Sequence, residues 1–270
     1  MKSVKCTAAV LTFNSEKTLR KTLSSVEDFS DIIICDGGST DGTLEIAKSY
    51  GARVIPQGKN YCYPDGRIKD FAGIRNQTLS AAKEDWFFFI DSDEYVEPPF
   101  VLELQKIISE AEVFAFWVPR KYVIDGKVID CAATYPNRQM RLFHRGHAKK
   151  FIKAVHERIE LLPGEKAAIL GVPMYIPFNT SVPDMRRKWD FYLGIELERE
   201  PVTARRVAKA FYTALKASVL YASRYVRNIF TCRGTHMPFS VEMERHRYNA
   251  VGVIQLTGAL FKKWFTGIPK

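Results

Sequence analysis

The sequence predicts an α/β fold, a doubly wound and mostly parallel sheet followed by a mixed sheet and a helical C-terminal tail. Apolar runs of strand type alternate with helical periodicity over roughly the first 95 residues, which is typical of parallel sheets built from β-α-β units. After Pro98 short strands follow one another closely, and from Asp184 onward the pattern is helical. We expect one domain over residues 1–180 and an extension over residues 181–270.

In the first third of the chain, each apolar run is followed by residues that cap helices or form turns. Asn14 and Ser15 can cap the first helix, and a Gly-rich turn follows the second strand. The expected order is strand 4–13, helix to 27, strand 31–35, helix 43–50, strand 52–55, loop 58–67, helix 68–83 and strand 87–90.

The remaining segments are assigned by the same periodicities. A helix is expected at 99–111, and short strands suit a mixed sheet beside the parallel one. The expected strands are 113–118, 122–129, 138–144 and 167–176, and the expected helices of the tail are 184–199, 203–228 and 240–264.

Composition narrows the class of protein. With 46% hydrophobic and 13% aromatic residues, the chain can bury a core, so disorder is not expected. The cysteines are five, an odd number, and none has Cys-x-x-Cys spacing, so we expect neither a zinc site nor disulfides, and a reducing compartment. We find no secretion signal and no apolar run of membrane-spanning length, so we expect a cytoplasmic protein that is soluble or peripheral on a membrane.

Positive charge is concentrated in the tail. Residues 181–270 carry 16 Lys and Arg against 7 Asp and Glu, whereas residues 1–180 carry 24 and 23. This excess indicates an anionic partner for the tail. The helix at 203–228 combines an apolar stripe, Val207, Phe211, Leu215, Val219, Ala222 and Val226, with a basic face, Arg205, Arg206, Lys209, Lys216, Arg224 and Arg227.

Two interpretations of this helix remain open. Its stripe can pack against the sheet and leave a solvated basic face, or the helix can attach to anionic lipid headgroups. Lys262, Lys263, Trp264 and Phe265 would also suit a membrane interface.

An acidic motif ends the strand at 87–90. Asp91 and Asp93 lie two residues apart, so in extended backbone both would point to one side. Two such carboxylates repel unless a cation or a shared proton intervenes. A hard cation, Mg²⁺ or Mn²⁺, would leave coordination positions for water and phosphate. The alternative is an acidic turn that caps the next helix.

Three motifs occur in a fixed order, at residues 12–14, 36–43 and 91–94. The ordered set, Thr-Phe-Asn, Asp-Gly-Gly-Ser-Thr-Asp-Gly-Thr and Asp-Ser-Asp-Glu, resembles the family 2 glycosyltransferases of GT-A fold. Residues 135–143 and 155–157 resemble the branch that contains lipopolysaccharide-core glucosyltransferases. The resemblance is specific through about residue 160.

The resemblance implies a nucleotide-sugar donor, with UDP as the expected nucleotide. Asp36 would hold the nucleobase, Asp91 would contact ribose or sugar hydroxyls, and Asp93 would bind the metal on the diphosphate. Gly37 stands where the family usually has a second Asp, a variant that also occurs in this branch. The pocket would further involve Thr12, Asn14, Glu16, Arg75 and Asn76.

The family also implies direct displacement with inversion of the anomeric centre, on a cell-envelope glycan or lipid-linked acceptor. Arg138 or Arg141 could pair with phosphate oxygens of the leaving group. The attacking hydroxyl must lose a proton, and Glu157 is the expected base. His156 is expected to contact the metal or the diphosphate and is the second candidate for acid–base work.

Other functions fit the residues less well. A sugar-phosphate nucleotidyltransferase would carry a Gly-rich loop with Arg and Lys after the first strand, where this chain has residues 12–16. A degenerate nucleotide-sugar-binding or membrane-attached scaffold remains open, although the acidic motif is complete. No nucleic-acid partner is expected, because residues 1–180 are nearly neutral.

Overall fold

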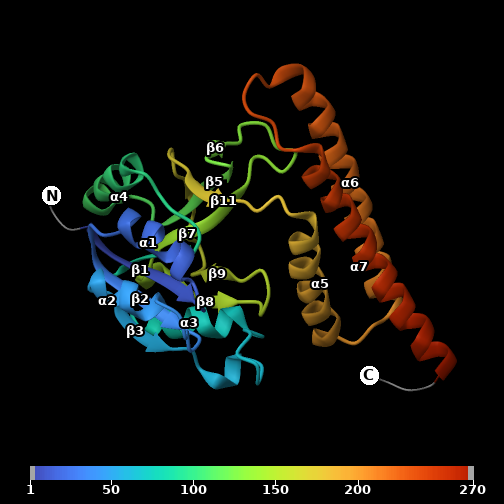
Figure 1. Cartoon of the computed structure of the whole chain (residues 1–270), viewed down its shortest axis with the longest axis horizontal. Coiled ribbons are helices and arrows are strands. Elements are labelled where there is room, and N and C mark those ends of the chain that lie inside the picture. The colour runs from blue at the N-terminus through green and yellow to red at the C-terminus, as the bar shows by residue number, and fades with distance from the viewer. Residues whose placement is uncertain (1–3, 267–270) are drawn as a thin grey trace. The chain divides into compact units, whose positions relative to one another are not determined.

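The computed structural model describes residues 4–266 (Figure 1). These residues divide into two compact units. The sheet unit consists of the residues up to Tyr122 together with Pro136–Pro177, and the helical unit consists of Val123–Tyr135 together with the residues from Phe178 onward.

The sheet unit begins with strands and helices in strict alternation. The apolar runs form the strands, and the amphipathic segments form the helices that cover them. In chain order these are β1 (Val4–Thr12), α1 (Glu16–Ser25), β2 (Phe29–Asp36), α2 (Thr43–Ser49), β3 (Arg53–Pro56), η1 (Lys59–Tyr61), α3 (Phe71–Ala81) and β4 (Trp86–Asp91).

A second series of shorter strands follows helix α4 (Pro98–Glu110). It comprises β5 (Ala115–Ile124), β6 (Lys127–Val128), β7 (Arg138–His144), η2 (Arg145–His147), β8 (Ala148–Ile152), β9 (Arg158–Leu161), β10 (Ala168–Ile169) and β11 (Met174–Pro177).

The main sheet has the strand order β10-β5-β7-β4-β1-β2-β3. Strands β4, β1, β2 and β3 are parallel, whereas β7 is antiparallel to both β4 and β5. The chain order reverses at β1, which lies between β2 and β4, and ligands of open α/β sheets bind at the carboxyl ends of strands beside such a reversal. The fold class expected from the sequence is confirmed.

Alternate residues of β4 enter two hydrophobic clusters, one on each face of the sheet. Phe88 and Ile90 pack with residues of α1, α2 and α4, while Phe87 and Phe89 pack with α3 and the β8–β9 hairpin. This double burial explains why the run 87–90 has no polar residue. It also fixes the strand so that Asp91 emerges at the sheet edge.

The helical unit contains α5 (Val182–Arg199), α6 (Ala204–Thr231) and α7 (Phe239–Thr266). Ring contacts of Tyr221 with His246 and of Tyr225 with Phe239 pack α6 against α7. The segment before Tyr135 is attached to these helices by the Cys131–Cys232 disulfide and by the Ala133 amide, which donates to Glu242. No helix among residues 4–266 is long and apolar enough to cross a membrane.

Three expectations need correction. The strands expected at 113–118 and 122–129 are largely one strand, β5, and the β8–β9 hairpin was not expected, because its strands are short and mix charged with apolar residues.

A disulfide was also not expected. Cys131 and Cys232 are 101 residues apart in sequence, and spacing along the chain cannot reveal such a pair. The cysteines therefore no longer indicate a reducing compartment.

The two interpretations of the α6 stripe, packing against the sheet and attachment to anionic lipid headgroups, stay predictions. Phe211, Leu215, Val219 and Val226 are each more than half exposed.

Candidate active site

The carboxyl ends of β1, β2 and β4 bring the predicted motifs to one edge of the sheet. Thr12 ends β1, Asp36 ends β2 and Asp91 ends β4. Thr12 pairs with Asp36 across the strands, and Leu11 pairs with Asp91. Parallel pairing of these strands therefore brings the three motifs close together.

The carboxylate of Asp36 organises the turn after β2. It accepts hydrogen bonds from the Thr12 hydroxyl at 2.8 Å, the Ser39 hydroxyl at 2.6 Å, and the amides of Gly38 and Ser39 at 2.8 and 2.7 Å. The side chain is buried. A nucleobase contact by Asp36 stays a prediction, and the structure adds a second role, which is to fix the shape of this loop.

Side chains of the first loop are bonded to the second. Asn14 has a φ of 48°. Its side-chain oxygen accepts from the Thr40 backbone amide at 2.9 Å, and its backbone amide donates to the Ser39 hydroxyl at 2.8 Å. Glu16 accepts from the Gly42 amide at 3.1 Å. Both residues are exposed at the predicted donor side, so the two loops form one continuous surface.

A side chain at position 37 would meet close neighbours. A Cβ at this position would lie 3.1 Å from the Phe13 ring and 3.2 Å from the Gln57 amide oxygen. Gln57 is held there because its amide nitrogen donates to the carbonyls of Thr12 and Cys35. In this chain Gln57 and Phe13 occupy the space beside the turn.

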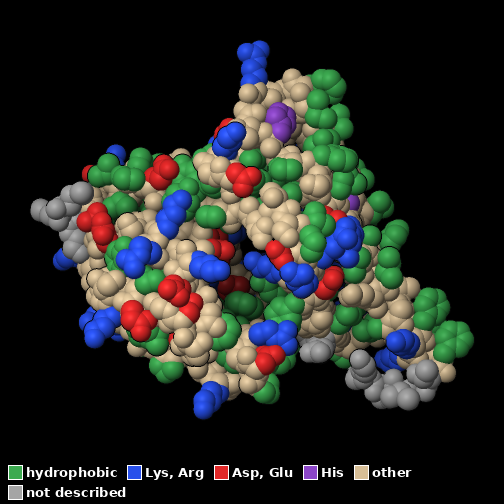
Figure 2. Space-filling view, in the orientation of Figure 1, with side chains coloured by type: hydrophobic (Ala, Val, Ile, Leu, Met, Phe, Trp, Pro, Cys, Tyr) green, Lys and Arg blue, Asp and Glu red, His purple; other side chains and the backbone are tan. Residues whose placement is uncertain are grey.

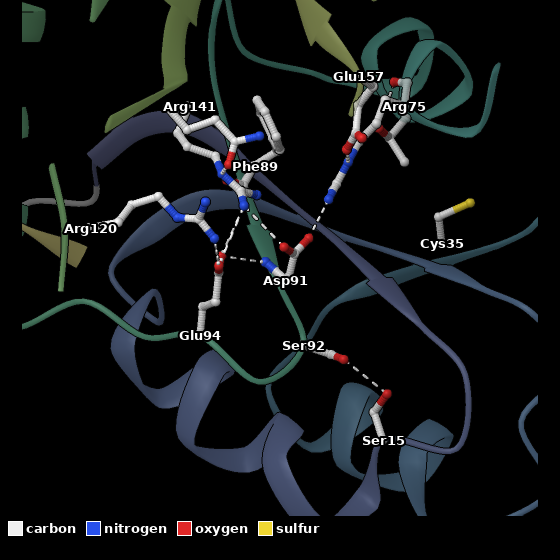
Figure 3. Close-up of polar contacts among 12 residues, drawn as sticks. Ser15, Cys35, Arg75, Phe89, Asp91, Ser92, Glu94, Arg120, Arg141 and Glu157 are labelled. Carbon is white, nitrogen blue, oxygen red and sulfur yellow. Dashed lines mark hydrogen bonds and ion pairs between the residues drawn. The ribbon is translucent and has the colours of Figure 1, made fainter. Parts of the chain in front are cut away.

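Asp91 lies between two buried arginines (Figure 3). Arg75 from α3 pairs with Oδ1, and Arg141 from β7 donates to Oδ2 at 3.0 Å. Both guanidinium groups also lie over the ring of Phe89, at 4.7 and 4.6 Å from its centre. Burial alone would raise the pKa of Asp91, but Arg141 and Arg75 outweigh it and hold this pKa well below its usual range.

Glu94 supplies a second buried carboxylate to the same network. It accepts from Arg120 at 2.7 Å and pairs with Arg141 at 3.3 Å, and it also accepts from the Asp91 amide at 3.2 Å. Glu94 and Arg141 are each 2% exposed, so both buried charges depend on the ion pairs of this network. Sequence reasoning assigned no role to Glu94 or Arg120.

Asp91 and Asp93 do not extend from one face of a strand, which corrects the expectation from their spacing. Strand β4 ends at Asp91, and a turn closed by the Glu94 amide and the Asp91 carbonyl follows. Asp91 is held by the arginines, whereas Asp93 is exposed in the turn. Among residues 4–266, no three His, Cys, Asp or Glu side chains are grouped to hold a metal, so Asp91, Asp93 and His156 do not form a closed site.

This arrangement suits a cation that is carried mainly by a ligand. Mg²⁺ keeps several waters and takes one or two carboxylates together with substrate phosphates, so an all-protein cage is not needed. The carboxylate of Asp93 is exposed, and its binding of a metal stays a prediction. The oxygens of Asp91 are already bonded to Arg75 and Arg141.

Arg75 also reaches the predicted base. Its Nε lies 3.4 Å from Glu157 Oε1, and the Arg75 side chain is only 1% exposed. Its Nη1 has no hydrogen-bond partner within the described residues. One guanidinium thus links Asp91 on β4 to Glu157, which immediately precedes β9.

Glu157 lines a cavity of about 380 Å³. Trp117, which is 40% exposed, contributes an aromatic wall, and Glu160 contributes another carboxylate. The cavity is completed by Gln139, Met140, Ile152, Arg158 and Ile159. Trp117 could not be singled out by sequence pattern, because a single aromatic residue in a strand is normally part of the core.

The remaining predicted residues differ in position. The amide of Asn76 both donates to and accepts from the backbone of Phe151, so it attaches α3 to β8. Arg138 is exposed at the start of β7, while Arg141, three residues on, is buried. His156 is exposed and has a φ of 54°. Direct contacts of these residues with a donor stay predictions.

A family profile described as "Glycosyl transferase family 2" matches residues 7–156, which include most of β1, all of β2 and β4, and the acidic motif. The chain belongs to the family 2 glycosyltransferases. The resemblance and the enzyme class expected from the sequence are therefore confirmed.

Curated relatives agree with this family. The chain is 28% identical over 225 residues to the lipopolysaccharide core biosynthesis glycosyltransferase LpsC of Rhizobium meliloti (strain 1021), covering 82% of this chain and 80% of LpsC. It is 27% identical over 158 residues to the glycosyltransferase SunS of Bacillus subtilis (strain 168), covering 56% of this chain. It spans only 34% of SunS.

A third relative has a more specific name. The UDP-Glc:alpha-D-GlcNAc-diphosphoundecaprenol beta-1,3-glucosyltransferase WfaP of Escherichia coli is 33% identical over 114 residues, covering 40% of this chain and 43% of WfaP.

Solved structures show more distant likenesses. S. aureus TarS has a TM-score of 0.46 and 17% identity, covering 86% of this chain and 44% of TarS. Glucosyl-3-phosphoglycerate synthase from Mycobacterium tuberculosis, crystallised with Mn²⁺, UDP and glucosyl-3-phosphoglycerate, has a TM-score of 0.35 and 24% identity, covering 44% of each chain.

Proposed function

We propose that this family 2 glycosyltransferase transfers a hexose from a UDP-sugar to a cell-envelope glycan or a lipid-linked saccharide, with inversion of the anomeric centre. The observation that carries the proposal is the position of Arg75, which joins Asp91 at the predicted donor side to Glu157 in the cavity. The names of LpsC and WfaP support the acceptor class, and that of WfaP supports the UDP-sugar donor.

The donor would lie along the carboxyl ends of β1, β2 and β4. The loops carrying Asn14, Glu16 and Asp36 would receive the nucleoside, and Asp91 would receive a ribose or sugar hydroxyl. Because Arg75 and Arg141 already fix Asp91, this carboxylate is ionised and oriented before the donor arrives. Exposed Arg138 would pair with a phosphate oxygen.

Asp93 would hold Mg²⁺ or Mn²⁺ on the diphosphate, with His156 as an additional contact. When bound, such a cation stabilises the negative charge that develops on the leaving nucleoside diphosphate. The exposure of Asp93 supports this assignment, because its carboxylate can be reached by a metal that enters with the donor.

The acceptor would occupy the cavity beside Glu157. An aromatic wall such as Trp117 offers an apolar surface to a sugar ring. As the acceptor oxygen attacks the anomeric carbon, the bond from that carbon to the diphosphate breaks, and the acceptor proton passes to the Glu157 carboxylate. Arg75 would hold that carboxylate in position until the proton arrives.

A membrane-bound acceptor would bring the enzyme to the inner face of the cell membrane, so we propose a peripheral enzyme in the cytoplasm. This location rests on the donor and acceptor classes, since the cysteines no longer support it.

The first experiment is thermal stability with UDP, UDP-sugars and other nucleotides, each with and without Mn²⁺. A ligand that binds only the folded state raises the midpoint, so a shift with UDP compounds that depends on Mn²⁺ is expected. A folded sample that shifts with no nucleotide would instead favour a degenerate scaffold.

Two variants separate the assigned roles. Asp93→Ala should lower transfer at least about a hundredfold and leave the fold intact. Glu157→Gln should lower turnover by about 10²–10⁴-fold with little change in donor affinity, whereas Glu160→Gln, in the same cavity, should have little effect. Activity of Asp93→Ala in excess Mg²⁺ and Mn²⁺ would refute the metal assignment, and unchanged turnover of Glu157→Gln would place the base elsewhere.

A further inference from the structure

Helix α6 carries an unusual number of exposed apolar side chains. Phe211, Leu215, Val219, Val226 and Phe230 are 52–82% exposed. They are spaced by four or seven residues, so they form one continuous stripe along the helix. Monomeric soluble proteins rarely expose such contiguous apolar surface without a binding function.

A row of cations borders this stripe. Arg205, Lys209, Lys216 and Arg227 are separated by four, seven and eleven residues, which places them on one adjoining face. The whole of α6 contains six Lys and Arg and no Asp or Glu. A third face, which includes Tyr221 and Tyr225, is used to pack on α7.

Helix α7 adds to the same kind of surface. Ile254, Phe261, Trp264 and Phe265 are 50–83% exposed, and Lys262 and Lys263 lie among them. Figure 2 shows hydrophobic side chains gathered along the edge of α6 and α7. These aromatic and basic residues are the types that occupy the boundary between lipid headgroups and acyl chains.

The carboxylates of α7 do not offset this charge. Glu242 is buried and accepts from the Ala133 amide. Glu244 is buried and pairs with Arg186 and Arg247. The outward charge of the α6–α7 surface is therefore positive.

We propose that the exposed surface of α6 and α7 binds the surface of a membrane that contains anionic phospholipids, with the helices lying in the headgroup region. A second copy of this chain fits poorly, because a self-complementary contact through α6 would oppose cations with cations. A spanning arrangement is also unsuitable, since none of the described helices could cross a bilayer. The apolar stripe can enter the boundary of the acyl chains, and the cations beside it can pair with anionic headgroups, so this surface matches an anionic membrane.

The experiment is flotation of the full chain with vesicles of phosphatidylcholine alone or with phosphatidylglycerol added. We expect binding only to the anionic vesicles, and weaker binding as salt rises, because screening shortens the range of the attraction. No nucleotide, metal or acceptor is present, so a negative result would leave the proposed transferase activity untouched.

Paired variants identify the surface. Lys209→Gln with Lys216→Gln should weaken binding by about 25-fold, at about fivefold for each cation near an anionic surface. Leu215→Gln with Val219→Gln should weaken it at least about tenfold while preserving the dependence on salt. Glutamine is a good helix former, and Leu215 and Val219 are both exposed, so circular dichroism should show unchanged folding.

Matched controls lie in the sheet unit. Lys48→Gln with Lys106→Gln removes the same charge, and Leu102→Gln replaces a leucine that is 60% exposed. Neither should change vesicle binding. Equal binding to neutral vesicles, no binding at low salt, or equal losses in the controls would overturn the proposal. Sedimentation analysis that finds a dimer abolished by the Leu215 and Val219 changes would assign the surface to a second copy instead.

Discussion

At the end of β4 charged side chains are buried and paired, whereas along α6 they face solvent beside exposed apolar residues. Arg141 and Glu94 are each 2% exposed and contact one another. On α6, Phe211 and Val219 are exposed, and so is Lys216 between them. The first arrangement satisfies its charges within the protein, whereas the second leaves apolar surface in solvent, which we propose a membrane covers. Substitutions should therefore reduce stability in the first region and binding in the second.

The largest effect should follow the loss of one buried charge. Arg141→Ala removes one of the two arginines that pair with Glu94 and one of the two that pair with Asp91, so we expect a loss of about 3–5 kcal/mol in the free energy of unfolding. Urea denaturation measures it. Arg138→Ala, on the same strand but exposed, should change stability by less than about 0.5 kcal/mol. Similar losses in both variants would show that the burial of Arg141 is not what matters.

A smaller effect concerns Asp31, which is buried at the other end of the sheet. Burial would raise the pKa of Asp31, but hydrogen bonds from Arg53 and the Lys83 amide outweigh it and lower this pKa. As the pH falls, the unfolded chain therefore takes up the proton first. The stabilisation is complete above about pH 4 and is lost below it.

Asp31→Asn should lower stability at pH 7 by about 1–3 kcal/mol, because Arg53 loses its charged acceptor. The variant should also lose less stability than the parent between pH 5 and about pH 3. Denaturation across this range tests both points, and parallel pH curves for the two proteins would exclude Asp31 as a source of the acid sensitivity.

Replacing a glycine by alanine should have opposite effects on stability in a tight loop and in an open stretch of helix. Gly37→Ala pushes a methyl group toward Phe13 and Gln57, so we expect a loss of about 1 kcal/mol. Gly194→Ala, inside α5 with nothing within 4 Å of the new Cβ, should add up to about 1 kcal/mol through helix propensity. Thermal melts measure the stability of both variants. Stability changes of the same sign in Gly37→Ala and Gly194→Ala would contradict the expected difference between the loop and the helix.

The smallest effect should be that of Val219→Gln on stability. Its side chain is 61% exposed, so we expect a change within about 0.5 kcal/mol, even where vesicle binding falls. A loss above about 2 kcal/mol would mean that Val219 is part of a folded core.

Much of the fold could be predicted because local patterns determine it. The apolar run at Phe87–Ile90 and the turn residues after Cys35 identify β4 and β2, and parallel pairing then brings Asp36 and Asp91 to one edge. The partners of these residues could not be predicted. Arg120 lies 26 residues from Glu94 and Cys131 lies 101 from Cys232, and no periodicity reports contacts at such separations.

The acidic motif shows that local geometry can also escape prediction from the sequence. Its residues were identified, but the extended geometry assumed for Asp91 and Asp93 was wrong, because the chain turns immediately after β4. The exposure of the α6 stripe was also outside the reach of sequence, since an amphipathic pattern is the same whether the helix covers a core or a membrane.

The guanidinium of Arg75 contacts two carboxylates at once, those of Asp91 and Glu157, which we propose serve the donor and the acceptor. In the proposed reaction, a shift of this guanidinium toward Asp91 would weaken its contact with Glu157, and a proton on Glu157 would remove the charge that attracts it there. Acceptor deprotonation and donor retention would then be timed by one cation. A kinetic study of Arg75→Lys should consequently find the order of substrate binding altered together with the rate, and not the rate alone.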